Sequence, residues 1–174
     1  LQTAWMVYPG AMHTRFQHSL GVMKLAGDFA RILYRRYKET GGLSDMPEEE
    51  HLVELFRIAG LLHDVGHGPF GHTLDELYTY KKYSKTHEDI GQKIIIEQLG
   101  GTISKIRRSP WGEFETPIDV EQLANLIKPS KPFTKPWEAN FSKIIYGLYS
   151  VDKLDYLLRD SYFCGTPEFG VIDI

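Results

Sequence analysis

Apolar residues recur at helical spacing in two long segments near the start of the chain. Val22, Leu25 and Phe29 lie three or four positions apart, which predicts an amphipathic helix over roughly residues 17–38. A second stripe predicts another helix, which ends near Gly66 and is formed by Leu52, Leu55, Phe56, Ala59 and Leu62. We therefore expect the first part of the fold to be a pair of packed helices.

Glycine and proline mark the next boundaries. The Gly-Pro step at 68–69 predicts a turn, and a short helix is expected over 70–78. Residues 87–99 have the pattern of a further helix, which we expect the glycine pair at 100–101 to end.

The middle of the chain is less regular. A short strand pair is expected around residues 103–106 and 114–118. Asp119 is typical of a helix N-cap, so the pattern predicts a helix over 119–127.

The last third begins with a loop that is rich in proline and lysine, at 128–137, and continues with one long predicted helix at 140–162. The expected fold class is therefore all-α, a helical bundle with at most a small β element. Residues 1–174 are interpreted as a single domain.

Three predicted helices each carry an ionisable residue on the apolar stripe. Because a helix turns about 100° per residue, His18, His63 and Asp152 lie within about 40° of the apolar members of their own stripes. Burying an unpaired carboxylate costs several kcal/mol, so the least unfavourable common arrangement gathers the three groups around a cation. Asp64, beside His63, would add a second carboxylate.

This interpretation has a simpler rival. A lone histidine on an apolar face is more often a satisfied core or helix-end residue than a ligand, but three such stripes and Asp64 favour a metal site. Two imidazoles and two carboxylates suit a divalent ion such as Zn, Mn, Fe, Co or Ni.

Composition adds limits to these expectations. The 174 residues carry a formal net charge of -3, which predicts no general attraction to nucleic acid. A lone cysteine, Cys164, cannot form an internal disulfide, and this favours a cytoplasmic setting. No apolar run is long enough to cross a membrane, and no signal-peptide pattern opens the chain. Because it starts without Met, we interpret the chain as a piece of a longer protein.

Four sequence blocks carry a resemblance to a known family. They are YPGAMHTRFQHSLGV (8–22), AGLLHDVGHGPFGHTLDEL (59–77), THEDIGQKII (86–95) and VDKLDYLLRDSYFCG (151–165). With the order H…HD…D, the chain resembles the HD superfamily of metal-dependent phosphohydrolases. Within it, the blocks are most similar to the deoxynucleoside triphosphate triphosphohydrolase branch, the branch of the SAM-and-HD-domain dNTPase. Residues 100–140 match least.

The resemblance implies roles for particular residues. One divalent metal ion, either Fe, Mn, Ni, Zn or Mg, would be held by His18, His63, Asp64 and Asp152. The residues implied in catalysis, through contact with the triphosphate or a carboxylate–imidazole pair near the scissile bond, are His67, His72, Asp75 and His87. Phosphate contacts would come from Arg15 and Lys153, and sugar contacts from Tyr156 and Asp160, the last at the 3′-hydroxyl.

The expected activity is hydrolysis of (deoxy)nucleoside triphosphates to nucleoside and triphosphate by metal-activated water, with Mg²⁺ accompanying the substrate. The expected partners are this nucleotide and a second copy of the chain; no membrane is expected, and the net charge disfavours nucleic acid without ruling it out. Two alternatives stay open: an HD phosphatase or phosphodiesterase acting on other nucleotides, and a nucleotide-sensing HD module without turnover.

Overall fold

The long first helix begins where the sequence supplies a capping box. The computed structural model describes residues 4–41 and 45–166, with only the backbone of Tyr78. A 3₁₀ turn, η1 (Ala4–Met6), precedes α1 (Arg15–Glu39). Thr14 caps α1: its side chain accepts a hydrogen bond from the Gln17 N–H, and the Gln17 side chain accepts one from Thr14 N–H.

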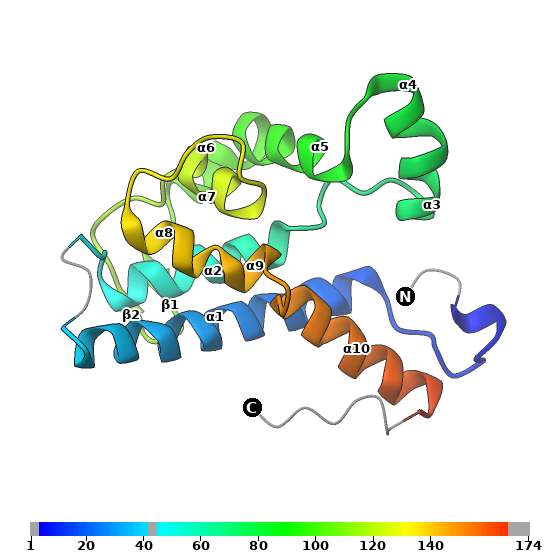
Figure 1. The fold of residues 1–174 in the computed structure, drawn as a ribbon, viewed down its shortest axis with the longest axis horizontal. Helices are drawn as coiled ribbons and strands as arrows, with labels where there is room; N and C mark the ends of the chain where they lie inside the picture. The colour runs from blue at the N-terminus through cyan, green and yellow to red at the C-terminus, as the bar shows by residue number, and fades with distance from the viewer. Residues whose placement is uncertain (1–3, 42–44, 167–174) are drawn as a thin grey trace.

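Helix α2 (Glu49–Leu62) runs antiparallel to α1 and lies along it (Figure 1). The two helices touch at Gly60, where a Cβ atom would lie only 2.8 Å from the carbonyl oxygen of Val22. This close approach requires glycine, and it allows the two predicted amphipathic faces to pack directly against each other.

A chain of short helices follows α2. The turn between α2 and these short helices places Phe70 and Gly71 at positive φ. It is followed by α3 (His72–Leu74), the π-helical η2 (Asp75–Tyr80) and α4 (Lys81–Tyr83). The short helix predicted over 70–78 therefore begins two residues later and extends further.

The helix predicted over 87–99 does not end at the glycine pair. Helix α5 (His87–Ile94) continues as the π-helical η3 (Ile95–Leu99) and then as α6 (Gly100–Ile103). Gly100 packs against the next helix, where a Cβ atom would lie 3.4 Å from Cγ1 of Val120. Tertiary packing thus overrides the weak intrinsic preference of glycine against helix.

The predicted strand pair was misplaced. Strands β1 (Arg108–Ser109) and β2 (Gly112–Glu113) form a small antiparallel hairpin, in which Arg108 lies opposite Glu113. The apolar residues that suggested strands lie outside the hairpin: Ile103 ends α6, and Phe114 and Ile118 are buried in the core.

Helix α7 (Val120–Ile127) confirms the capping prediction, because the Asp119 side chain accepts hydrogen bonds from the N–H groups of Glu121 and Gln122. The single long helix predicted over 140–162 is wrong. The chain instead forms α8 (Pro136–Phe141), α9 (Lys143–Tyr146) and α10 (Val151–Cys164). Gly147 is extended at the break, and Ser150 caps α10.

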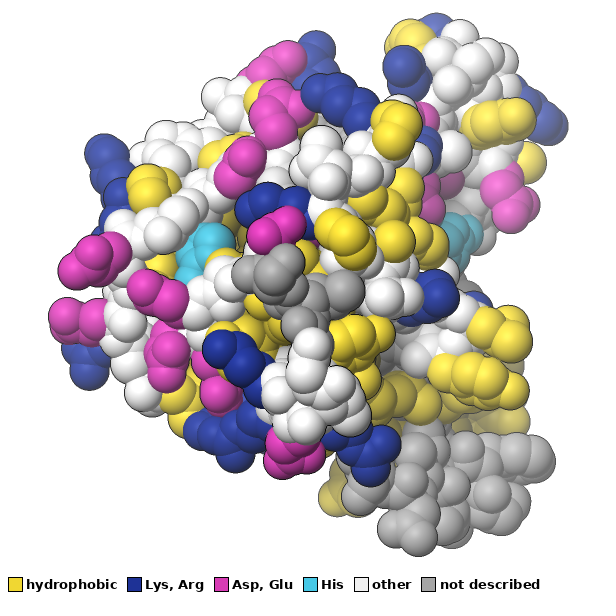
Figure 2. All heavy atoms as spheres, turned by 60° about the vertical axis from the view of Figure 1, so that its left-hand side comes forward, with side chains coloured by type: hydrophobic (Ala, Val, Ile, Leu, Met, Phe, Trp, Pro, Cys, Tyr) yellow, Lys and Arg dark blue, Asp and Glu magenta, His cyan; other side chains and the backbone are white. Residues whose placement is uncertain are grey.

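The fold class is all-α with a small β element, as predicted. The core lies between α1, α2, α7, α8 and α9, and its largest fully buried side chains include Leu55, Phe56, Leu126, Trp137 and Phe141. On the face brought forward in Figure 2, lysines and arginines are interspersed with aspartates and glutamates. Among the described helices, none has both the length and the apolar character of a membrane span.

Candidate active site

Two histidines of the α1–α2 pair lie next to each other. His18 is in the first turn of α1 and His63 directly follows α2, and their residues are 1% and 8% exposed. The ring centroids are 5.3 Å apart, with the rings at 74°. Both imidazoles that the sequence predicted as ligands are therefore buried at one end of the helix pair.

Two carboxylates complete the cluster. Asp64 follows His63 in the chain, and Asp152 lies in the first turn of α10. Asp152 Oδ1 lies 3.1 Å from His18 Nε2 and 3.5 Å from His63 Nε2, and Asp64 Oδ1 lies 3.3 Å from His63 Nε2. The structure thus brings all four predicted ligands together, from three separate parts of the chain.

The outer nitrogen of each imidazole is hydrogen-bonded. His63 Nδ1–H donates to the carbonyl oxygen of Gly60 at 2.7 Å, and His18 Nδ1–H donates to Asp155 Oδ2 at 2.7 Å. Because both partners accept, each Nδ1 carries the proton when the ring is neutral. Each Nε2 lone pair then faces the centre of the cluster, as in many metal-binding histidines.

The donor atoms fit one metal ion. Ligand atoms about 2.1 Å from a shared ion lie roughly 3.0–3.5 Å from one another, close to the separations found here. His63 Nε2 is one of several buried side-chain atoms of the described residues that form no hydrogen bond, although it lies 3.3 and 3.5 Å from oxygens of Asp64 and Asp152. A buried nitrogen left unpaired is unfavourable, so the geometry favours an ion at this point.

The electrostatics of the cluster favour positive charge. Burial lowers the pKa of His18, but hydrogen bonds and charge from Asp152 and Asp155 outweigh it and raise the pKa to about 9. Burial would raise the pKa of Asp152, but the imidazoles of His18 and His63 hold this pKa below its usual range. The carboxylates are therefore ionised at neutral pH, and their charge is balanced by protons or by a metal.

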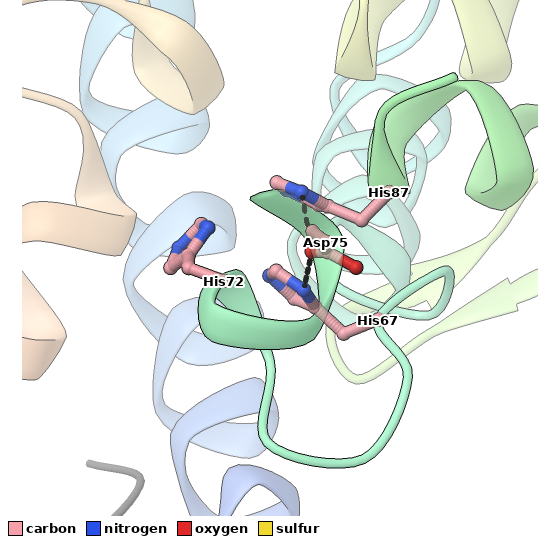
Figure 3. Close-up of side chains that lie close together, drawn as sticks. All are labelled: His67, His72, Asp75 and His87. Carbon is pink, nitrogen blue, oxygen red and sulfur yellow. Dashed lines mark hydrogen bonds and ion pairs between the residues drawn. The ribbon is translucent and has the colours of Figure 1, made fainter. Parts of the chain in front are cut away.

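The four predicted catalytic residues, His67, His72, Asp75 and His87, form a second cluster, which Figure 3 shows. His67 Nδ1–H donates to Asp75 Oδ2 at 2.6 Å, and His87 Nδ1 lies 3.3 Å from the same oxygen. The rings of His67 and His87 stack with centroids 3.6 Å apart, and His72 meets both edge-on. One buried carboxylate thus orients two imidazoles.

The two clusters are linked. His67 Nε2 lies 3.5 Å from Asp64 Oδ1, so this ring stands between the two carboxylates Asp64 and Asp75. Burial lowers the pKa of His87, and the neighbouring charge of His67 lowers it further.

A cavity of about 730 Å³ joins the clusters. Its walls include the four predicted metal ligands, His72 and His87 of the second cluster, and the predicted substrate contacts. His67 and Asp75 lie behind its surface, with side chains 2% and 9% exposed. The volume is in the range of small-molecule sites.

The predicted substrate contacts all line this cavity: Arg15, Lys153, Tyr156 and Asp160. Arg15 Nη1–H donates to Asp64 Oδ2 at 2.7 Å. Lys153 Nζ lies 3.0 Å from the carbonyl oxygen of Leu148 and 3.4 Å from that of Gly147, at the break before α10. Asp160 is hydrogen-bonded to His13 at 2.6 Å.

The sequence interpretation gave no role to three supporting residues, Asp155, Arg159 and His13. Asp155 holds His18, and Arg159 holds Asp155 through contacts of 2.9 and 2.7 Å. The spacing of Asp155 could have indicated its role, because Asp155 lies three residues after the predicted ligand Asp152 on the same helix face. His13 had no such indication, since its partner Asp160 is remote in the sequence.

Comparison with known proteins finds similar chains in several organisms. An uncharacterised protein of Methanocaldococcus jannaschii is 35% identical over 170 residues, covering 98% of this chain and 28% of that protein. The deoxynucleoside triphosphate triphosphohydrolase SAMHD1 homolog of Dictyostelium discoideum is 35% identical over 177 residues, covering 94% and 30%. This chain thus spans about a third of the length of these relatives.

A solved structure and a family model agree with these similarities. The crystal structure of a hypothetical protein from Aquifex aeolicus superposes with a TM-score of 0.64 at 35% identity, covering 95% of this chain and 37% of that one. The HD domain family model matches residues 15–129, which include three of the four clustered ligands. Since this match covers more than half of the chain, the chain belongs to the HD domain family.

Proposed function

We propose that this chain is the catalytic domain of a metal-dependent phosphohydrolase that hydrolyses deoxynucleoside triphosphates to nucleoside and triphosphate. The observation that carries the proposal is the convergence of His18, His63, Asp64 and Asp152, with the orphaned Nε2 of His63, on the wall of the cavity. The name of the Dictyostelium relative supports the substrate class.

His18, His63, Asp64 and Asp152 would hold one divalent ion, and when bound it supplies a Lewis acid and a water of lowered pKa. The mixed nitrogen and oxygen donors suit Mn, Fe, Zn, Co or Ni. Asp155 keeps the His18 ring in the orientation that this binding requires.

Arg15 and Lys153 would neutralise the charge of the phosphates. The Arg15 guanidinium is already aimed at the cluster by Asp64, so a phosphate oxygen bound there would meet a forked donor. For Lys153, the ammonium group would exchange its two carbonyl contacts for a phosphate oxygen.

The second cluster would supply the proton that the leaving group needs. Release of a nucleoside breaks the bond between the α-phosphorus and O5′, and the leaving oxygen needs a proton. His87 lines the cavity, and Asp75 Oδ2 orients it through Nδ1. A bound triphosphate favours the protonated imidazole, which allows His87 to hold a proton near the leaving group. His72 would contact the triphosphate, and His67, held by Asp75, would connect the second cluster to Asp64.

Tyr156 and Asp160 would lie along the sugar. Both are on α10, downstream of Asp152, so one helix would hold the metal at one end and the sugar further along. Asp160 would accept a hydrogen bond from the 3′-hydroxyl.

The test is a product assay. The purified protein, loaded with Mn²⁺, is incubated with each deoxynucleoside triphosphate, and nucleoside and inorganic triphosphate are separated by anion-exchange chromatography. We expect equimolar nucleoside and triphosphate, and an Asp64→Asn variant should form neither. Release of phosphate or pyrophosphate would instead support a different phosphohydrolase. Nucleotide binding without turnover would support a sensing module.

A further inference from the structure

A fully buried histidine joins the segment before α1 to the far end of α10. The His13 side chain is 0% exposed, and its ring stacks on Phe163 with centroids 4.8 Å apart at 22°. The backbone of the same segment also packs closely against α10, since a Cβ atom at Gly10 would lie 3.0 Å from the carbonyl oxygen of Phe163. The His13 ring therefore has a fixed position.

This fixed ring holds a carboxylate on the cavity wall. The contact between His13 Nε2 and Asp160 Oδ1 is 2.6 Å, and Nε2–H donates because a carboxylate only accepts. The Asp160 side chain is 32% exposed and lines the cavity that contains the metal-ligand cluster. One partner is buried and packed against Phe163, and the other faces the space that a substrate would fill.

We infer that His13 is a positioning residue that fixes Asp160 for recognition of a sugar hydroxyl. The inference rests on the proposed function and deepens it, because it names the residue that sets discrimination at that hydroxyl. With one oxygen anchored by a charge-assisted hydrogen bond, the carboxylate presents itself to the cavity without losing rotamer freedom on binding.

The competing explanation is a purely structural cross-link. In that case His13 would hold residues 8–14 against α10, and its loss would lower stability or activity on every nucleotide equally. A positioning role predicts something different: the loss depends on whether the substrate carries a 3′-hydroxyl.

Three variants separate these explanations. His13→Phe keeps a ring to stack on Phe163 but removes the donor, and His13→Gln restores a donor near the position of Nε2. His51→Leu is the matched control, because His51 is also buried but packs on Phe114, away from the cavity. For each Mn²⁺-loaded protein, kcat and KM are measured with a deoxynucleoside triphosphate and with its 2′,3′-dideoxy counterpart.

The wild type should prefer the deoxy substrate by roughly 10- to 100-fold in kcat/KM, the range for one hydrogen bond to a charged group. His13→Phe should lose most of this preference while still turning over the dideoxy substrate. His13→Gln should retain most of it, and His51→Leu should retain it fully. If His13→Phe does not fold, His13→Leu replaces it with the same expectation: loss of the preference supports the inference, and a decrease in kcat/KM that is equal for both substrates overturns it.

Each remaining outcome is decisive. A His13→Phe variant that discriminates as well as the wild type overturns the inference and leaves the proposed function standing. A wild type that hydrolyses the deoxy and dideoxy substrates equally also overturns the inference and leaves the proposed function standing. A wild type that hydrolyses no nucleoside triphosphate overturns the proposed function, and this inference with it.

Discussion

The Nδ1 nitrogen of His18 lies 2.7 Å from Oδ2 of Asp155, and this contact turns the other ring nitrogen towards Asp152. Arg159 fixes the same carboxylate through two contacts, of 2.9 and 2.7 Å. The candidate metal site therefore depends on a residue that is not itself a ligand.

Replacing this carboxylate should weaken metal binding. The Asp155 carboxylate accepts hydrogen bonds from both His18 and Arg159, whereas the amide of Asp155→Asn has a single oxygen acceptor. We therefore expect Mn²⁺ affinity to fall about 10- to 100-fold. Isothermal titration calorimetry on the metal-free protein measures this. Asp28→Asn, which changes a carboxylate paired with Lys24 on the exposed side of α1, should bind Mn²⁺ like the wild type. Equal affinity for Asp155→Asn would show that His18 does not need this partner.

A methyl group at Gly21 should have a similar effect. A Cβ atom there would lie 1.8 Å from Asp155 Oδ1, so Gly21→Ala must displace the carboxylate that orients His18. We expect a loss of about 1–3 kcal/mol in the free energy of unfolding, typical of overpacking, together with weaker Mn²⁺ binding.

The control for this change is another helical glycine. Apart from its chain neighbours and the backbone of its own helix, a Cβ atom at Gly101 would have no heavy atom within 4 Å, so Gly101→Ala should stabilise the protein by up to about 1 kcal/mol. Urea unfolding of both variants measures the difference. Equal stability of Gly21→Ala and the wild type would contradict the packing around Asp155.

Loss of the proposed proton donor should lower turnover and leave the metal in place. For His87→Gln, general acid catalysis predicts a decrease in kcat of about 10²- to 10⁴-fold. Mn²⁺ affinity should stay unchanged, because His87 is oriented by Asp75 and not by one of the four proposed ligands. Steady-state kinetics and calorimetry on the same preparation give both values. A variant with unaltered kcat would remove His87 from the proton path.

Stability should depend on pH through Asp89. Hydrogen bonds from Lys128 and the Thr86 backbone lower the pKa of this carboxyl from 3.8 to about 2. A lowered pKa in the folded state means that the carboxylate stabilises the protein above pH 4 and that this contribution disappears as the pH falls towards 2. Asp89→Asn should therefore be less stable than the wild type at pH 7, and the difference should narrow below pH 4.

Urea midpoints at pH 7, 5, 4 and 3 test this dependence. A difference that stays constant over the whole range would show that Asp89 acts through its shape and not through its charge.

Local sequence features predicted the parts of the fold that they determine. The apolar stripes of α1 and α2 and the Asp119 cap needed no information from distant residues. The helix break at 147–150 depends on the cap at Ser150, which the periodic pattern of 140–162 concealed. The helical continuation through Gly100 depends on contact with Val120.

The candidate site shows the same division. His18 and His63 were identified from their own helices, and the structure places them as the stripes predicted. Asp152 was assigned to a continuous stripe that does not exist, and it reaches the cluster because α10 begins anew at Val151. The contact of His13 with Asp160 required the fold itself.

The proposed chemistry requires that His18, His63, Asp64 and Asp152 share one ion. An anomalous-scattering map from crystals grown with Mn²⁺ would locate that ion. We expect a peak about 2.0–2.3 Å from the Nε2 atoms of His18 and His63 and from an oxygen of each aspartate. A map with no peak at this point, or with Mn²⁺ bound solely among His67, His72, Asp75 and His87, would contradict the shared site.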